Sequence, residues 1–448
     1  MIYMNQNFMK EKPVFPLVLS MSLPMVLSML VNSLYNIVDS YFIAKISEEA
    51  MTALSLVYPV QILVNSVAVG FGIGINAVAA YYLGAQEKDK ADNAVSLGLL
   101  FSILHGALLT VLCLAGISHF LSVFTENETI IGYGRDYSYI VFLFSLPLMI
   151  GITFEKIFQA EGQMTVSMIS MLCGCMINII LDPVMIFGAG FIPAMGIKGA
   201  AIATGIGQVV SLIIYLVIYF KKPLPLKLKF RRKMMDGKLC RQIYAVGIPA
   251  AFNMALPSVL ITVLNGILAS FSQVYVLVLG IYFKLQTFIY LTANGIVQGI
   301  RPIIGYNYGA GEYGRVRKIF QAALACTGVV MAVGTVICFT SANHLMALFT
   351  ENRDTIQTGQ TALRIISLGF IVSSVSVISC GALEGLGKGL PSLTISLMRY
   401  IVIIIPAAFL LSRIFGAVGV WHAFWAAEGI TAVAALIIYK KTVLKAVK

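Results

Sequence analysis

The sequence predicts an all-α polytopic membrane protein with twelve transmembrane helices in two six-helix lobes. Its 448 residues are 59% hydrophobic and only 11% charged, with a mean hydropathy of +0.91. Apolar runs of about twenty residues recur, which is the length a helix needs to cross a bilayer. The runs are continuous, whereas a membrane β-barrel requires alternating apolar and polar residues.

Polar breaks between the apolar runs define twelve expected spans. Several exceed the length of about 20 residues that crossing requires, so we expect tilted or bent helices. In chain order the spans lie at 14–44, 52–83, 93–119, 136–160, 164–188, 197–220, 243–270, 274–307, 316–342, 355–383, 390–412 and 415–439.

The two halves of the chain are duplicates of each other. The segment Phe-Thr-Glu-Asn at 124–127 recurs unchanged at 349–352, and Glu161-Gly162 recurs as Glu384-Gly385. A repeat offset near 225 residues over many such markers indicates an internal duplication. Six spans per half is an even number, so the lobes should be related by a pseudo-two-fold axis along the membrane normal.

The net charge of +12 comes from basic residues that cluster between the apolar runs. This pattern fits orientation in a bilayer better than nucleic-acid binding. Residues 221–241 hold nine basic residues and one acid, so we expect a cytoplasmic linker between an N-lobe at 1–220 and a C-lobe at 242–448. Both termini should then be cytoplasmic, in a multi-pass protein of the cell's inner (plasma) membrane.

One stretch places polar groups inside an apolar run. Asn178 and Asp182 are four residues apart, so they share one face of a helix, and Pro183 should kink that helix and free a carbonyl near Ile179. An acid, an amide and loosened backbone are the parts of a site for a small cation. The alternative is an acid that caps a helix end near the membrane surface.

Two further polar residues are expected at a similar depth. Asp39 lies near the outer end of the first span, and Thr204 lies early in the sixth. Two carboxylates that meet in a low-dielectric cavity cannot both stay ionised cheaply, so the pair should take up a proton or a Na⁺. Tyr35, one turn before Asp39, either holds its carboxylate or is a core tyrosine. Asn178 and Thr204 alone are also explained by interhelical hydrogen bonding.

The second half lacks this set of side chains. By the repeat offset, Asp182 corresponds to Ile405, Asn178 to Ile401 and Asp39 to Leu264. The sequence therefore locates cation chemistry in the first half.

Other polar residues are expected to line a central substrate cavity. Lys284 lacks an evident partner, so it either lines the cavity or meets an acid of the first half. For Arg301, gating and snorkelling to the interface both stay open. The full set of expected lining residues is Gln61, Asn65, Tyr139, Tyr282, Phe283, Lys284 and Gln286.

Arg399 and Glu428 both fall near the expected midplane of the second half. Isolated charges are costly there, so we expect a structural ion pair. The four histidines are scattered and the seven cysteines lack metal spacing, so we expect no enzyme constellation, bound metal or cofactor.

The chain resembles the MATE (multidrug and toxic compound extrusion) transporters over nearly its whole length. The fragments that carry the resemblance are Ser22-Leu-Pro24, Tyr35-Asn-Ile-Val-Asp39, Leu83-Gly-Ala85, Asn178-x-x-Leu-Asp182-Pro183, Gly199-Ala-Ala-Ile-Ala-Thr204, Gly247-Ile-Pro249 and Gly305-Tyr-Asn-Tyr-Gly-Ala310. The resemblance implies a cation-coupled antiporter with two lobes around a central cavity. Within that family, one branch couples through acids at positions matching Asp39 and Asp182, with Asn178 and Thr204 alongside, and another branch uses acids on the seventh and tenth spans. Here the seventh span has no acid and the tenth has none before Glu384, so the resemblance favours coupling through the N-lobe.

The sequence thus predicts a multidrug efflux antiporter that exchanges amphipathic, often cationic, small molecules for H⁺ or Na⁺. We expect a monomer whose partners are drugs and membrane lipid. One alternative is a flippase for lipid-linked saccharides from the same superfamily, which would need several cationic residues in its cavity. A membrane enzyme or a channel is a further alternative, and the sequence favours it less.

Overall fold

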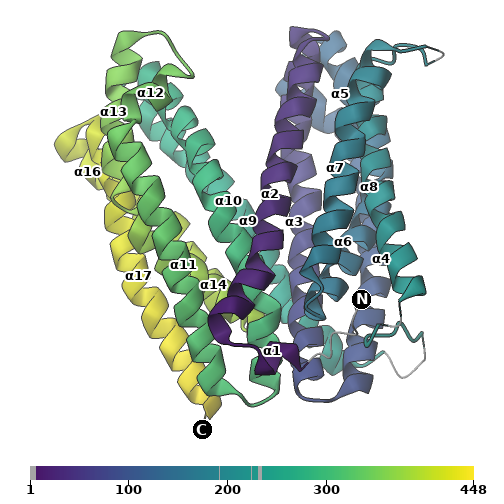
Figure 1. The fold of residues 1–448 in the computed structure, drawn as a ribbon. Coiled ribbons are helices and arrows are strands. Elements are labelled where there is room, and N and C mark those ends of the chain that lie inside the picture. The colour runs from purple at the N-terminus through teal and green to yellow at the C-terminus, as the bar shows by residue number, and fades with distance from the viewer. Residues whose placement is uncertain (1–6, 191, 223, 231–234, 448) are drawn as a thin grey trace. The chain divides into compact units, whose positions relative to one another are not determined.

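The structure is a computed structural model that describes residues 7–190, 192–222, 224–230 and 235–447. These residues form helices in the order shown in Figure 1. In chain order they are α1 (Phe8–Glu11), α2 (Val14–Ala44), α3 (Glu48–Gly84), α4 (Lys88–Phe124), α5 (Glu128–Leu143), α6 (Ser145–Ala160), α7 (Met164–Phe187), α8 (Ile197–Lys221), α9 (Gly237–Ala269), α10 (Gln273–Gly309), α11 (Tyr313–Thr340), α12 (Ala342–Ala347), α13 (Arg353–Ser367), α14 (Phe370–Gly385), α15 (Gly389–Leu397), the π-helix η2 (Met398–Ile403), α16 (Ile404–Phe415) and α17 (Ala417–Val447).

Within the described ranges, ten helical spans are long and apolar enough to cross a membrane, and two bent pairs bring the number to as many as twelve. The bent pairs are α5 with α6, at 44°, and α13 with α14, at 54°, where single spans at 136–160 and 355–383 are predicted. Pro147 explains the first bend. Its ring would clash with the carbonyl of Leu143, four residues earlier, and α5 ends at Leu143.

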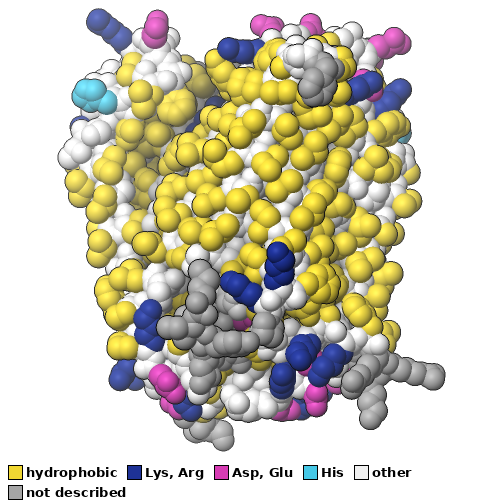
Figure 2. All heavy atoms as spheres, turned by 45° about the vertical axis from the view of Figure 1, so that its right-hand side comes forward, with side chains coloured by type: hydrophobic (Ala, Val, Ile, Leu, Met, Phe, Trp, Pro, Cys, Tyr) yellow, Lys and Arg dark blue, Asp and Glu magenta, His cyan; other side chains and the backbone are white. Residues whose placement is uncertain are grey.

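The helices run beyond several predicted spans because helical geometry continues after the apolar run stops. For example, α4 covers Lys88–Phe124, whereas the apolar run predicts 93–119. The face in Figure 2 shows the corresponding distribution: apolar side chains cover most of it, and charged side chains lie mainly toward its two ends.

The chain packs into two compact units. One unit is Leu27–Ala251, and the other joins the described residues up to Val26 with those from Phe252 onward. These boundaries differ from the predicted ones at residues 220 and 242. They fall inside α2 and α9, so the first part of each of these helices packs in a different unit from the rest of the helix.

Each unit has its own apolar core. In the 27–251 unit, buried residues such as Ile117, Tyr137 and Ile186 form one cluster, which draws on α2, α3, α4, α5, α7 and α8. In the other unit, a cluster around Tyr282 and Trp421 joins helices α9 to α14, α16 and α17.

Part of the predicted linker is bound to the 27–251 unit. The backbone amide of Leu226 donates to Glu161 at 2.7 Å, that of Lys227 donates to Asp92 at 2.9 Å, and that of Lys229 donates to Ser96 at 2.8 Å. The Lys229 ammonium also forms an ion pair with Asp92 at 2.7 Å. Residues 224–230 are therefore attached along their length, while residues 223 and 231–234 of the linker lie outside the described residues.

Candidate functional site

Asp39 lies on α2, within the 27–251 unit. Its side chain is buried, with 8% of the residue exposed. Its Oδ1 atom has no hydrogen-bond partner among the described residues. A buried acceptor in this condition costs about 1–3 kcal/mol, so a proton or a cation bound to it would be stabilising.

Asn178, Asp182 and Thr204 form a hydrogen-bonded group on α7 and α8. The Asn178 amide donates to Asp182 Oδ1 at 3.2 Å and to Thr204 Oγ1 at 3.4 Å. All three are buried, and Asp182 is fully so. The two residues that the sequence places one turn apart on α7 thus meet the threonine of the next helix. The structure buries Asp182 in the unit, which argues against a capping acid near a helix end.

Close packing of α7 on α8 allows this contact. The two helices run side by side (Figure 1), and a Cβ atom on Gly174 would lie 2.0 Å from Ser211 Oγ and 2.6 Å from the carbonyl oxygen of Gly207. Small residues let membrane helices approach at such distances. Pro183 lies inside α7, which continues to Phe187.

Tyrosines complete the group. Tyr35 on α2 and Tyr137 on α5 are both within electrostatic range of Asp39 and Asp182. Gln61 on α3 donates to the Tyr137 hydroxyl at 3.2 Å. Tyr137 is not among the residues predicted for this site, because nothing in the sequence of a helix with several tyrosines shows which hydroxyl points inward.

The group contains more acceptors than donors. Asp39 Oδ1, Asn178 Oδ1 and Asp182 Oδ2 are all buried without a hydrogen-bond partner among the described residues. Asp39 and Asp182 are also within electrostatic range of each other. Carboxylate, amide and hydroxyl oxygens are the ligands of hard cations, and one carboxyl group can instead hold a proton between two carboxylates. The oxygens of this cluster therefore fit either Na⁺ or H⁺.

The matching positions of the second half are apolar in the structure as well. Leu264 is fully buried in the core cluster of its unit, and Ile405 packs against that cluster. Within the described residues, no group of three or more His, Cys, Asp or Glu side chains is arranged to hold a metal ion.

The other predicted cavity residues of the 27–251 unit lie apart from the acidic group or at its edge. Asn65 is exposed, and its amide donates to the carbonyl of Gln61, one turn earlier. Tyr139 is 41% exposed, and its hydroxyl lies 3.3 Å from that of Ser118. Gln61 alone of these three reaches the group, through Tyr137.

The predicted lining set on α10 does not share one surface. Tyr282 is only 1% exposed and belongs to the core, and Phe283 packs against the same core cluster. Lys284 is exposed, with its ammonium 5.9 Å from the centre of the Phe349 ring, and Gln286 is half-buried. Successive helical residues point about 100° apart, so neighbours such as Tyr282 and Lys284 face different directions. Tyr282 is a core residue rather than a lining one.

Arg399 and Glu428 lie in contact. The guanidinium donates through Nε at 2.8 Å and through Nη2 at 2.6 Å, both to Oε1 of Glu428. Arg301, for which the sequence left gating and snorkelling open, forms an ion pair with Glu384 at 2.6 Å. Asn253 also donates to Glu384, at 3.0 Å. Both arginines are thus neutralised within their own unit.

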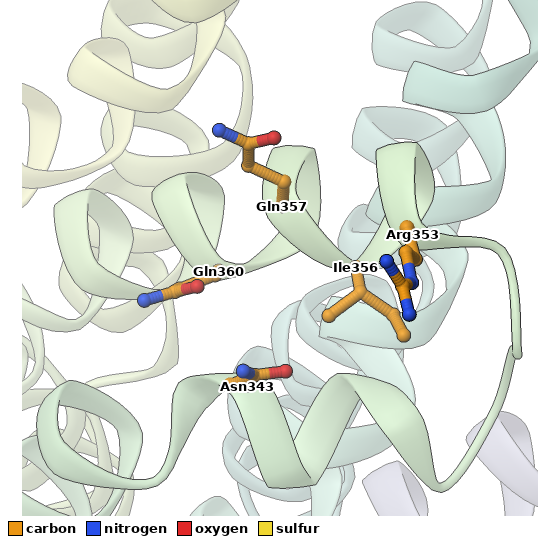
Figure 3. A pocket seen from close by; sticks show the side chains of 5 residues that line it. All are labelled: Asn343, Arg353, Ile356, Gln357 and Gln360. Atoms are coloured by element: carbon orange, nitrogen blue, oxygen red, sulfur yellow. The ribbon is translucent and has the colours of Figure 1, made fainter.

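A shallow pocket lies elsewhere, between α12 and α13. Figure 3 shows Asn343 of α12 opposite Ile356 and Gln360 of α13, with Arg353 and Gln357 also at the pocket. It contains none of the predicted site residues and no acid, so it does not resemble the oxygen cluster on α2, α7 and α8.

Comparison with known proteins agrees with this fold. A family model described as MatE matches residues 24–184 and 249–410. Over 432 residues the chain is 27% identical to the multidrug export protein MepA of Staphylococcus aureus, covering 96% of this chain and 94% of that protein. It is 26% identical, with the same coverage, to MepA of Staphylococcus haemolyticus.

Solved structures share the fold. One is an outward-facing conformation of a multidrug resistance MATE family transporter of the MOP superfamily, with a TM-score of 0.93, 20% identity and full coverage of both chains. Another is a MOP superfamily transporter from Pyrococcus furiosus, for which a reversed polarity of the binding pocket suggests a different function. It has a TM-score of 0.92, 20% identity and full coverage of both chains.

Proposed function

The chain belongs to the MatE family, and from this premise we propose that it is a multidrug efflux antiporter. It exports amphipathic, often cationic, small molecules, and the entry of H⁺ or Na⁺ drives the export. The relatives named as multidrug export proteins support the exported class of compound, because they match almost the whole chain.

The observation that carries the coupling proposal is the surplus of buried acceptor oxygens around Asp39 and Asp182. Three of these oxygens have no donor among the described residues, and two of them belong to carboxylates. A cation that enters this group satisfies acceptors that the protein leaves open. The group should therefore bind an ion in at least one state of the transport cycle.

Coupling then requires a difference between states. An ion shifts a conformational equilibrium only by as much as its affinities for the two states differ. Asp39 lies on α2, whereas Asp182 and Thr204 lie on α7 and α8. A movement of α2 against α7 and α8 would separate the oxygens and release the ion. A drug that favours the ion-free state then gives the coupling free energy that antiport needs.

The distribution of basic residues supports one orientation of the protein in the membrane. The basic linker, and the basic residues at the helix ends on the same side as the linker, should face the cytoplasm, together with both termini. The attachment of Lys227 and Lys229 to Asp92 and Ser96 keeps part of this basic segment on the proposed cytoplasmic end of α4. We place the protein in the cell's inner (plasma) membrane, as a monomeric transporter without enzymatic activity or a resident cofactor.

The flippase alternative loses support from two ion pairs. It needs cationic side chains that are available for phosphate, but Arg301 pairs with Glu384 and Arg399 pairs with Glu428. Lys284, by contrast, is exposed, and its ammonium lies 5.9 Å from the centre of the Phe349 ring.

Transport by reconstituted variants tests the proposal. We expect Asp39→Asn and Asp182→Asn each to abolish ethidium export from proteoliposomes under an imposed pH gradient or an imposed Na⁺ gradient. The reason is that an amide cannot release a proton and supplies no negative charge for Na⁺. Asp136→Asn is the matched control, since Asp136 is an exposed acid of the same unit, paired with Lys198 at 3.3 Å.

The two gradients also identify the ion, because only the gradient of the coupled ion should drive export by the unmodified protein. Wild-type rates in both Asp39→Asn and Asp182→Asn would contradict ion coupling at this group. Loss of export in Asp136→Asn as well would show that any lost acid in this unit impairs transport.

A further inference from the structure

The unit that contains residues 252–447 holds a buried carboxylate, that of Glu428, whose charge is neutralised by Arg399 of the same unit. Arg399 lies on the π-helix η2, and Glu428 lies on α17. Only 9% of the Arg399 side chain and 13% of the Glu428 side chain are exposed. Two guanidinium nitrogens bond to one carboxylate oxygen, at 2.8 and 2.6 Å, and Ser376 donates to the other oxygen at 3.4 Å.

The rest of the guanidinium is also satisfied. Its Nη1 donates to the Tyr400 hydroxyl at 3.2 Å, and its Nη2 donates to the Tyr290 hydroxyl at 3.0 Å. Both tyrosine rings lie within cation–π range, at 5.1 Å for Tyr400 and 5.5 Å for Tyr290. Tyr290 in turn donates to Ser373 at 2.7 Å. Neither Arg399 nor Glu428 has a buried polar atom without a partner among the described residues.

The internal repeat makes this arrangement informative. In the repeat, the helical segment that carries Arg399 corresponds to α7, and α17 corresponds to α8. The Asp182 group of the first half and the Arg399–Glu428 pair of the second half therefore lie on corresponding pairs of helices. In the first repeat, α7 and α8 bring together Asp182, Asn178 and Thr204, with acceptors left open. In the second, the corresponding helices bring a carboxylate together with a cation that cannot leave.

The local backbone is also unusual at this point. Met398–Ile403 forms a π-helix just before Pro406, whereas α7 stays α-helical up to and past the matching Pro183. Single π-turns inside α-helices occur frequently at functional sites. The π-helix, which has no counterpart in α7, therefore contains Arg399, the residue that supplies the positive charge.

We propose that Arg399 is a tethered counter-cation: it holds Glu428 as a mobile ion would hold the acids of the first repeat, so the second repeat exchanges no ion. The inference rests on the proposed cation coupling. It adds that the number of ions moved per drug is set by the Asp39 and Asp182 group alone. Removing the Arg399 charge should then create a second exchangeable acid at Glu428.

The two tryptophans of the chain provide a local reporter. Trp421 and Trp425 both lie on α17, and Trp425 is three residues before Glu428. Trp425 Cα and Glu428 Cγ lie 3.1 and 3.3 Å from the same point, a Cβ built on Gly369. A change in the charge of Glu428 should therefore alter tryptophan emission.

Other titratable groups face this pair and must be accounted for. They are Tyr282 and Tyr290 on α10, Tyr400 on η2 and Cys380 on α14. His422 on α17 accepts a hydrogen bond from the reporter Trp425 at 3.0 Å. These groups are present in all variants, so their contribution cancels in the differences between variants.

The experiment compares the whole protein in detergent with Arg399→Gln and with the double variant Arg399→Gln/Glu428→Gln. Tryptophan emission is followed from about pH 5 to pH 9, because burial without a partner raises the pKa of a carboxyl group by up to about 3–5 units. We expect the wild type and the double variant to titrate alike, and Arg399→Gln to gain one additional inflection. We also expect Arg399→Gln to move more H⁺ or Na⁺ per ethidium in proteoliposomes than the double variant does.

The double variant guards against misfolding, because it buries two neutral amides and leaves no unpaired charge. A titration step present in the wild type and lost in the double variant would show that Glu428 already exchanges protons, and would overturn the proposal. A folded Arg399→Gln without the extra inflection would overturn it too. Neither result depends on Asp39 or Asp182, whose variants test the proposed function separately.

Discussion

Glu161 is a buried carboxyl group in the short connection between α6 and α7, where it binds the linker. Only 3% of the residue is exposed, and the Leu226 amide donates to its Oε1 at 2.7 Å. Burial raises the pKa of Glu161 from 4.5 to about 8, and the bond from Leu226 opposes part of this rise. The group therefore tends to be protonated near neutral pH while it still accepts the backbone hydrogen bond.

The raised pKa of Glu161 predicts how stability depends on pH. Between pH 4.5 and about 8 the folded protein keeps a proton on Glu161 that the unfolded chain has lost. Because the folded state binds more protons than the unfolded state in this window, the contribution of Glu161 to stability falls as the pH rises through it. We expect the Tm of the purified protein to fall less between about pH 5 and pH 8 in Glu161→Gln than in the wild type.

Glu126→Gln serves as the control for this measurement, because Glu126 is an exposed acid in the connection between α4 and α5. It should keep the wild-type change of Tm with pH. An equal change of Tm in the wild type and in Glu161→Gln would contradict the assignment of a raised pKa to this carboxyl group.

At the scale of helices, the candidate cation group depends on how closely α7 approaches α8. A Cβ atom on Gly174 would meet Ser211 Oγ at 2.0 Å and the backbone of Gly207 at 2.6 Å. Overpacking of this kind costs about 1–3 kcal/mol. It should also move α8 away from α7 and lengthen the contact of 3.4 Å between Asn178 and Thr204.

We therefore expect Gly174→Ala to lower the Tm and to weaken export, although no side chain of the oxygen group is changed. Gly116→Ala is the matched substitution, since a Cβ on Gly116 meets nothing within 4 Å. In a helix interior that exchange is favourable by about 1 kcal/mol, so it should leave export intact and maintain or raise the Tm. Thermal unfolding of both variants together with ethidium transport checks the pair, and normal transport by Gly174→Ala would contradict the role of helix proximity.

Individual elements show what the sequence could and could not predict. Hydropathy places the spans well, because the length of an apolar run reflects bilayer thickness. Hydropathy alone does not show the bends at Phe144 and Gly369, although Pro147, whose ring clashes with the preceding turn, is a sequence signal for the first of them. Helical spacing pairs Asn178 with Asp182 correctly, yet it groups Tyr282 with Lys284, and side-chain direction separates these two.

At the scale of the whole molecule, the sequence divides the chain at its linker, whereas packing divides it within α2 and α9. The division falls within α2 and α9 because each helix begins by packing on glycines of another helix, a feature that hydropathy does not reveal. In one unit, glycines of α10 receive the beginning of α2. In the other, glycines of α3 receive the beginning of α9. Each unit therefore contains the start of a helix whose remainder belongs to the other.

The distances show how tight these glycine contacts are. A Cβ on Gly299 would lie 2.6 Å from Ser22 Cα, and one on Gly295 would lie 2.6 Å from Val26 Cα. On α3, a Cβ on Gly74 would lie 2.4 Å from the Ile243 carbonyl oxygen. Gly70, at 2.5 Å from the Ala251 nitrogen, is the repeat partner of Gly295. In all four cases the obstacle is backbone, which cannot rotate away as a side chain can.

This symmetry leads to a prediction for the transporter as a whole. Gly74→Ala and Gly299→Ala occupy equivalent positions, 225 residues apart in the repeat. Each should displace the start of a helix from its unit, cost about 1–3 kcal/mol, and impair export to a similar degree. Gly280→Ala is the control on α10, since a Cβ there meets nothing within 4 Å. Equal losses in Tm and in ethidium transport for the two variants would support equivalent roles for the two helix starts. An effect of Gly74→Ala without one of Gly299→Ala would show that the α3–α9 contact alone matters for transport, despite the duplication.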